Sequence, residues 1–317
     1  MDAALDAVLR VLPALALLLT NGVILIWMLR KVLGHLHLRL GPTKNGPFGL
    51  TQTLFDVVKL VTKEAIAPKN VDKLLYYLAP LIVFVPALLM YAPLPFSETL
   101  VMADMEYGLI FLFVMSAIGP LGVFLAGWAS ANKWSLLGAV RSIGQQVFYE
   151  IPLLLSVIPI VMITGSLNLV DISLAQSGMW NIVWQFPAFI IFFIAVLSEL
   201  NQPPFDLAEA ETELIGGFGT EYSAMKFGLM YLAEFSNTFI AGALITTLFF
   251  GGFQLGPFSG PVVFILKTYF WIFVIMIVRG TMPRLRVDQQ QLLNWKFLLP
   301  ASLAWIMISA VILKVVA

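Results

Sequence analysis

The sequence has 317 residues, with no cysteine and only two histidines. Without cysteine, the chain can form no disulfide and can hold no cysteine-ligated iron–sulfur cluster. His35 and His37 have no third candidate ligand near them in the sequence, so we predict no metal or haem site. The net charge at pH 7 is zero, which leaves no basic face for nucleic acid.

Charged residues are also scarce. They make up 11% of the chain, against roughly 25% in an ordinary soluble domain, while hydrophobic residues make up 60%. Stretches of about twenty residues without any charge recur along the chain, and about twenty apolar residues allow a helix to cross a bilayer. Because these stretches show no alternation of period two, we predict helices rather than strands.

The sequence therefore predicts an all-α, polytopic membrane protein in which residues 1–317 form one integral-membrane domain. No internal repeat is visible in the sequence. Eight transmembrane helices are expected, at residues 8–30, 74–95, 106–128, 137–163, 180–200, 224–249, 261–280 and 297–315.

Basic residues gather in links that eight spans would place on one side of the membrane. Eight lysines and arginines lie within residues 30–73, and four more flank the link between the last two spans. The links on the other side carry acidic residues and almost no lysine or arginine. Since basic loops remain inside, we predict that both termini lie outside and that residues 199–222 form an inner loop.

The first inner link contains a predicted amphipathic helix at about residues 50–63. Leu50, Leu54, Val57, Val58 and Val61 recur at helical spacing and form an apolar face. The opposite stripe holds polar side chains, among them Asp56 and Lys59. A helix of this kind lies in the membrane interface or against other spans.

The inner loop 199–222 is acidic, although apolar stretches lie on both sides of it. Its six carboxylates are Glu199, Asp206, Glu209, Glu211, Glu213 and Glu221, and no lysine or arginine occurs from residue 142 to residue 225. One or two helical turns over residues 206–214 would place Asp206, Glu209 and Glu213 on one face. Unpaired carboxylates that lie this close raise one another's pKa values. The alternative is an ordinary solvated acidic loop.

Two further glutamates, Glu150 and Glu234, lie inside predicted spans. A charge in the middle of a membrane is costly, so such residues usually face a polar cavity or transfer protons. Arg141 is a candidate counter-charge for Glu150. The alternative is a neutral carboxylic acid that is hydrogen-bonded to a neighbouring helix.

Four long motifs resemble one family, the quinone-site membrane subunit of respiratory complex I, which is called H in bacteria and subunit 1 in mitochondria. In order along the chain, the motifs are RLGPTKNGPFGLTQTLFDVVKLVTKE (39–64), GWASANKWSLLGAVRSIGQQVFYEIPL (127–153), ELNQPPFDLAEAETELIGGFGTEYS (199–223) and RGTMPRLRVDQQQLLNWKFLLP (279–300). The resemblance covers nearly the whole chain.

The resemblance implies an eight-helix subunit that forms much of a quinone tunnel and couples quinone reduction to proton translocation. It implies quinone as the substrate, with the iron–sulfur clusters, FMN and the NADH site on partner subunits. Those partners would be the peripheral-arm quinone-site subunits and the small membrane-arm subunits, in the plasma (inner) membrane of a prokaryote. The six loop carboxylates, with Glu150 and Glu234, match the family's proton-coupling residues. The family's residues that line the quinone tunnel and its loops match Arg39, Asp56, Lys59, Arg279, Arg284 and Arg286.

Other functions remain open at this point. An equivalent subunit of a related complex that oxidises ferredoxin or a deazaflavin, or evolves hydrogen, would carry its distinguishing cofactors on other chains. A stand-alone ion transporter is a second alternative, although many transporter folds show internal repeats. A structural membrane anchor is a third, but it would need neither Glu150 nor Glu234. The kind of quinone is not determined by these residues.

Overall fold

The computed structural model describes residues 2–208, 211–256 and 258–316. Six of its helices are long and apolar enough to cross a membrane, and two shorter apolar helices accompany them. These eight elements are α1 (Asp2–Leu36), α3 (Lys73–Leu89), α4 (Gly108–Ala129), α5 (Lys133–Thr164), α8 (Phe186–Glu199), α10 (Ala224–Phe249), α11 (Pro261–Thr281) and the continuous helix formed by α12 (Val287–Leu292), η3 (Leu293–Leu298) and α13 (Leu299–Val316). The prediction of an all-α membrane protein is confirmed.

The remaining elements are short and lie in the links. They are the 3₁₀ turns η1 (Pro47–Gly49) and η2 (Gly217–Gly219), the helices α2 (Thr51–Thr62), α6 (Leu169–Ala175), α7 (Asn181–Trp184) and α9 (Glu211–Leu214), and a hairpin of β1 (Gln254–Leu255) and β2 (Phe258–Ser259). One predicted span is interrupted. Residues 180–200 form α7 and then α8, because the helix restarts at Phe186 with Pro187 in its first turn.

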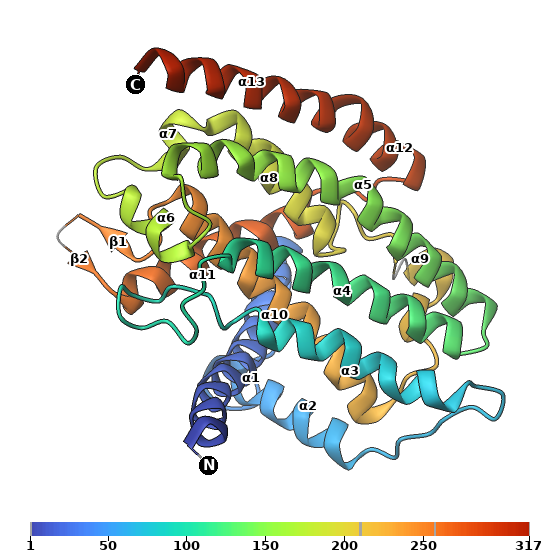
Figure 1. The fold of residues 1–317 in the computed structure, drawn as a ribbon. Coiled ribbons are helices and arrows are strands. Elements are labelled where there is room, and N and C mark those ends of the chain that lie inside the picture. The colour runs from blue at the N-terminus through green and yellow to red at the C-terminus, as the bar shows by residue number, and fades with distance from the viewer. Residues whose placement is uncertain (1, 209–210, 257, 317) are drawn as a thin grey trace.

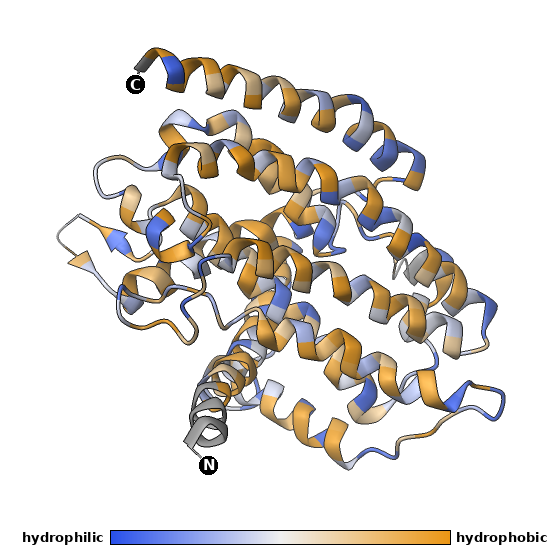
Figure 2. Cartoon of the chain, in the orientation of Figure 1, coloured by the Kyte–Doolittle hydropathy of each residue, from blue (hydrophilic) through white to orange (hydrophobic). Residues whose placement is uncertain are grey.

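The long helices pack in two groups (Figure 1). Helices α13, α5, α4 and α3 contact one another in that order, and α10 packs behind them against α3, α11 and α1. Most of α10 is buried. In the view of Figure 2 the long helices are mainly hydrophobic, and many hydrophilic residues lie in the links and at helix ends. This is the pattern expected of helices that meet lipid on their outer surfaces.

The amphipathic helix is confirmed as α2, within one residue of the predicted bounds. Its polar stripe faces α1, where Arg30 Nη1 donates to Asp56 Oδ2 at 2.5 Å, while Gln52 Nε2 donates to Asp56 Oδ1 at 2.9 Å. Its apolar side chains Leu54, Val58 and Val61 are more than half exposed. The helix therefore presents its apolar face outward, as an interfacial helix does.

The acidic loop leaves the end of α8 and lies along α5. Gln145 Nε2 of α5 donates to the carbonyls of Ser198 and Phe205, at 2.7 and 2.9 Å. The backbone N–H of Leu285, in the link after α11, donates to the Pro204 carbonyl at 2.8 Å. The backbone at the start of this loop is therefore hydrogen-bonded to two other parts of the chain.

The predicted helical turns over residues 206–214 are wrong at their beginning. Asp206 lies in non-helical backbone, and the helix covers only Glu211–Leu214 among the described residues. The carbonyls of Pro204 and Phe205 are used by Leu285 and Gln145, so they do not form a helical ladder. Asp206 and Glu213 consequently do not share a helix face, and Glu209 lies outside the described residues.

Candidate functional site

A large cavity opens between α1, α2 and α10. Its volume is about 660 Å³, and its lining is mainly apolar and aromatic, with Ile26, Val57, Leu60, Phe227 and Tyr231. The polar part of the lining includes Arg30 of α1 together with Thr53, Asp56, Lys59 and Lys63, so the predicted polar stripe of the amphipathic helix faces this cavity. Pockets that bind small organic molecules have this size and this mixture of apolar walls with a few polar groups.

A second cavity continues from the first into the helix bundle. The two share Phe218, Phe227 and Tyr231 in their linings. The second has a volume of about 80 Å³ and contains both Glu234 and Glu199. Since a water molecule needs roughly 10–15 Å³ of such space, this cavity has room for several waters.

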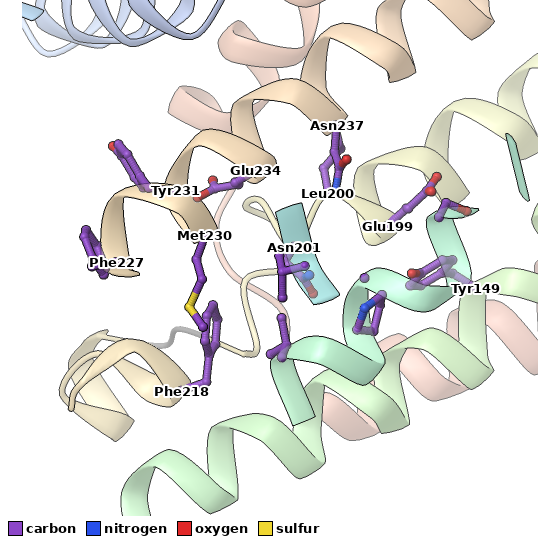
Figure 3. A pocket seen from close by; sticks show the side chains of 15 residues that line it. Tyr149, Glu199, Leu200, Asn201, Phe218, Phe227, Met230, Tyr231, Glu234 and Asn237 are labelled. Carbon is purple, nitrogen blue, oxygen red and sulfur yellow. The ribbon is translucent and has the colours of Figure 1, made fainter. Parts of the chain in front are cut away.

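Four helices bring polar groups of this second cavity together (Figure 3). Glu234 and Asn237 come from consecutive turns of α10, Glu199 from the end of α8, Tyr149 from α5 and Ser116 from α4. In the view of Figure 3, Asn237 lies between the two glutamates. Its Oδ1 atom is buried and has no hydrogen-bond partner in the part of the chain that the structure describes. A water between the glutamates would satisfy that atom.

A third, narrower cavity follows on the far side of Glu199. It shares Ser116, Glu199 and Asn237 with the second and is otherwise apolar, with a volume of about 10 Å³. That volume is about the space of one water. Glu199 therefore lies where the wide, polar part of this series of cavities ends.

The two cavity glutamates have different partners. The Glu234 carboxylate lies 3.6 Å from Arg279 Nη1 of α11, and both side chains are about one-fifth exposed. Glu199 forms no ion pair with a basic side chain among the described residues, and its carboxyl is hydrogen-bonded to Ser116. A carboxyl without a counter-charge in a low-dielectric site exchanges its proton more readily near neutral pH than one held by an arginine.

Glu150 lies on α5 just beyond the second cavity and does not line it. Its carboxyl is hydrogen-bonded to Gln146, and the side chain is partly exposed on the surface of the bundle. The predicted counter-charge is wrong, because Arg141 turns to Glu213 instead. Nine residues along a helix place Arg141 more than two turns away from Glu150.

Glu213 is held by two arginines from distant parts of the chain. Arg141 Nη1 of α5 contacts Glu213 Oε2 at 2.6 Å, and Arg284 Nη2 contacts Glu213 Oε1 at 3.1 Å. The hydrogen bond from Arg141, together with that from Arg284, lowers the pKa of Glu213 below its usual range. The expectation of unpaired, mutually raised carboxylates is therefore wrong for Glu213.

The other predicted site residues lie in the links and at helix ends. Glu221 accepts a hydrogen bond from Asn132 Nδ2 at 2.6 Å, in a depression between Lys69 and Lys133 that is separate from the three cavities. Arg39 lines a pocket of about 310 Å³ that meets the large cavity at Arg30. Arg286 is exposed and pairs with Asp288 at 2.8 Å. Glu211 begins α9.

The sequence matches the family described as NADH dehydrogenase over residues 9–310. The chain belongs to the NADH dehydrogenase family. Among similar members, the NADH-quinone oxidoreductase H subunit of Dehalococcoides mccartyi (strain CBDB1) is 46% identical over 293 residues, which cover 92% of this chain and 82% of that one. The H subunit of Brevibacillus brevis is 48% identical over 294 residues, covering 91% and 88%. That of Rhodospirillum centenum is 41% identical over 313 residues, covering 96% and 93%.

Some residues of the site in this NADH dehydrogenase family member were not predicted from the sequence. Ser116 and Asn237 line the second and third cavities, beside Glu199. Phe218 and Tyr231 line the passage between the first and second cavities. Asn237 follows Glu234 by three residues on α10, so the helical face of a buried glutamate was a usable signal. Ser116 carried no such signal, because it contributes the hydroxyl from a different and otherwise apolar helix.

Close packing of α5 against the acidic loop makes Gly138 sensitive to substitution. A Cβ atom there would lie 2.7 Å from the Ala208 carbonyl oxygen and 2.9 Å from Gly217 Cα, both of them backbone atoms. We expect Gly138→Ala to displace the loop and to destabilise the subunit by about 1–3 kcal/mol, as overpacking does. Thermal unfolding of the purified complex measures this. Gly144→Ala is the control on the same helix, where a Cβ meets nothing within 4 Å; equal melting temperatures for both variants would contradict the expectation.

Proposed function

We propose that this chain is the membrane subunit of a proton-translocating NADH:quinone oxidoreductase that holds the quinone and conducts protons between the quinone cavity and the membrane. The single observation that carries the proposal is the series of cavities with shared walls. It runs from the amphipathic helix α2, through Phe218, Phe227 and Tyr231, to Glu234 and Glu199. The relatives are named as subunits of NADH-quinone oxidoreductases, and their names support the same reaction.

The large cavity suits a quinone by size and by chemistry. Its apolar and aromatic side chains favour an isoprenoid chain and a flat ring, and ring stacking on Phe227 or Tyr231 adds to burial. Arg30 and Asp56 neutralise each other in the lining, and the ammonium groups of Lys59 and Lys63 can donate hydrogen bonds to the carbonyl oxygens of a quinone head group. Because α2 turns its apolar side outward, a quinone dissolved in the membrane would reach the cavity beside this helix.

The proposed proton path uses the second cavity. A quinone that takes up two electrons also takes up two protons. Beyond the charged side chains of the large cavity itself, the carboxyl groups along the cavity walls that can supply protons are Glu234 and then Glu199. Arg279 holds Glu234 in place, and Glu199 exchanges the proton. Glu150, partly exposed on the bundle surface, would in turn supply a proton to Glu199. The inner end of this proton path would be formed by the other carboxylates of the acidic loop, Asp206, Glu209, Glu211 and Glu221. We also propose that residues 1–317 form one domain.

The amphipathic helix supplies a test of the quinone path. Val57 lines the large cavity from α2, so Val57→Trp would fill part of it. We expect the apparent KM for quinone to rise about fivefold, while electron entry from NADH to an artificial acceptor stays normal. Val58→Trp is a matched control, because Val58 is absent from that lining and is 57% exposed. A normal KM for Val57→Trp in an assembled complex would remove α2 from the path.

Partners and cofactors follow from the same proposal. The chain would be one subunit of a multi-subunit complex, with NADH, FMN and iron–sulfur clusters bound by peripheral-arm subunits. The loops that carry Arg39, Arg284 and Arg286 at the inner ends of the helices would meet those subunits. A small membrane-arm subunit would cover α4 and α5, because Glu150 is otherwise partly exposed to lipid.

The protein is a multi-pass membrane protein, and we propose the plasma membrane of a prokaryote with both termini on the periplasmic side. The basic links support this orientation. A periplasm-active reporter fused after Ala317 should be active, and the same reporter fused after Lys63 should be inactive. A cytoplasm-active reporter should give the opposite pattern. Activity of the cytoplasmic reporter at Ala317 would reverse the orientation.

A further inference from the structure

Six buried side-chain atoms lie on helices that pack against one another, α5 on one side and α12 with η3 on the other. They are Ser142 Oγ and Gln145 Oε1 on α5, and both amide atoms of Gln290 and of Asn294. None of the six has a hydrogen-bond partner among the described residues, and the four side chains are at most 2% exposed. We call these four residues the α5–α12 seam.

Four contacts fix the two sides of the seam at the same level. Arg141, next to Ser142, and Arg284, in the link before α12, bind the same Glu213 carboxylate. Gln145 donates to the Phe205 carbonyl, and the N–H of Leu285 donates to the neighbouring Pro204 carbonyl. Since α5 also packs directly against α12 and η3, Ser142 and Gln145 lie beside the first turns of that helix.

The helix geometry on the second side is unusual. Gln290 and Asn294 are four residues apart and form one buried stripe, which continues through Leu298 to Ser302. Asn294 lies in η3, a six-residue π-helix. Insertions of this kind occur often at functional sites. Two fully buried amides with no protein partner require another partner, and water is the molecule small enough to supply both a donor and an acceptor.

We propose that the α5–α12 seam binds a short chain of water molecules that delivers protons from the inner surface to Glu199. One end lies at Glu213, whose side chain is 48% exposed. The other lies at Gln145, whose Nε2 atom is bonded to the Ser198 carbonyl, directly before Glu199. This inference rests on the proposed proton-coupling function and adds a second source of protons to it, separate from the quinone cavity.

The proton transfer balances without any further reactant. A water at the inner end accepts a proton from the solution, each water passes one proton to the next, and the last forms the O–H bond of the Glu199 carboxylic acid. The side-chain amides and the serine hydroxyl neither gain nor lose a proton near neutral pH. Their role is to hold the waters in order, so they are positioning residues.

The test uses the whole complex, purified and reconstituted in vesicles of the host's lipids. Asn294→Leu keeps the volume of the side chain and removes both polar atoms. We expect proton uptake from the inner side and quinone turnover to fall about tenfold, with the quinone KM unchanged. Ser142→Ala is a milder second variant, in which we expect a fall of about threefold. An electron cryo-microscopy map should show ordered water at the four side chains of the parent, and fewer waters in Asn294→Leu.

Ser302→Ala is the matched control on the same buried stripe. Its hydroxyl is already bonded to the Leu299 carbonyl at 2.8 Å, so proton uptake should be normal. Amides that pair directly with each other in the map, with no water, would overturn the seam. So would normal uptake in both Asn294→Leu and Ser142→Ala. The two proposals fail in different ways. If the proposed function is wrong, Glu199→Gln turns over quinone normally. If only the seam is wrong, Glu199→Gln is slow while Asn294→Leu and Ser142→Ala are normal.

Discussion

Glu199→Gln is expected to lower NADH-driven quinone turnover about tenfold, which corresponds to ~1.4 kcal/mol in the barrier, and to lower proton translocation at least as much. Glutamine keeps the shape of the side chain and can accept the hydrogen bond from Ser116, but it cannot exchange a proton. Glu199 lies at the end of the second cavity and also borders the third, narrower one. Every proton that passes between these cavities therefore meets this carboxyl.

Donor oxidation and proton uptake in reconstituted vesicles measure this effect, with assembly checked on a native gel. Glu98→Gln is the control, because Glu98 lies in the link before α4, away from the three cavities. Normal turnover and normal pumping in an assembled Glu199→Gln complex would exclude Glu199 from the proton path.

Glu213→Gln is also expected to lower turnover about tenfold, but for a different reason. The substitution leaves Arg141 and Arg284 without their shared carboxylate, although these arginines are only 30% and 24% exposed. We expect the acidic loop to loosen from α5, so the melting temperature of the complex should fall together with the turnover. In Glu199→Gln the melting temperature should stay normal. A Glu213→Gln complex with parental melting temperature and turnover would show that the two ion pairs are dispensable.

The same ion pairs determine how Glu213 responds to pH. Its pKa is lowered in the folded protein, so its stabilising effect is complete above the pKa of an unfolded glutamate, about 4.3, and is lost as the pH falls through the lower folded value. Glu213 therefore stays ionised throughout the neutral range. Any change in turnover between pH 6 and 8 should persist in Glu213→Asp, which keeps the charge, when both proteins are titrated in parallel.

The transmembrane helices could be predicted from the sequence because lipid imposes a simple rule. A helix that crosses a bilayer needs an uninterrupted apolar run, and seven of the eight runs each correspond to one continuous apolar helix, while residues 180–200 form α7 and α8. The one break, at Gln185 and Phe186, falls where Pro187 could have been read as the start of a new helix. The amphipathic helix could also be predicted, because a helix at the membrane interface needs apolar residues at helical spacing on one face.

The arrangement of the acidic loop could not be predicted in this way. Its carbonyls are bonded by Gln145, about 60 residues earlier, and by Leu285, about 80 residues later, so no local pattern in residues 199–222 records them. The partners of Glu213 are distant for the same reason. The carboxylates themselves were predicted, but the cavities beside Glu199 depend on how α4, α8 and α10 meet, which is a property of packing.

The length of α8 also gives Glu199 an electrical position. Its 14 residues extend about 21 Å at about 1.5 Å per residue, whereas the hydrocarbon core of a bilayer is about 30 Å thick. In the proposed orientation, and with the start of α8 placed at the outer boundary of the hydrocarbon core, α8 ends well short of the inner solution. Part of the transmembrane voltage drops between that solution and Glu199, at about 2.3 kcal/mol per elementary charge for each full 100 mV. The occupancy of Glu199 by a proton then depends on the membrane potential, whereas that of Glu213, at the inner surface, does not.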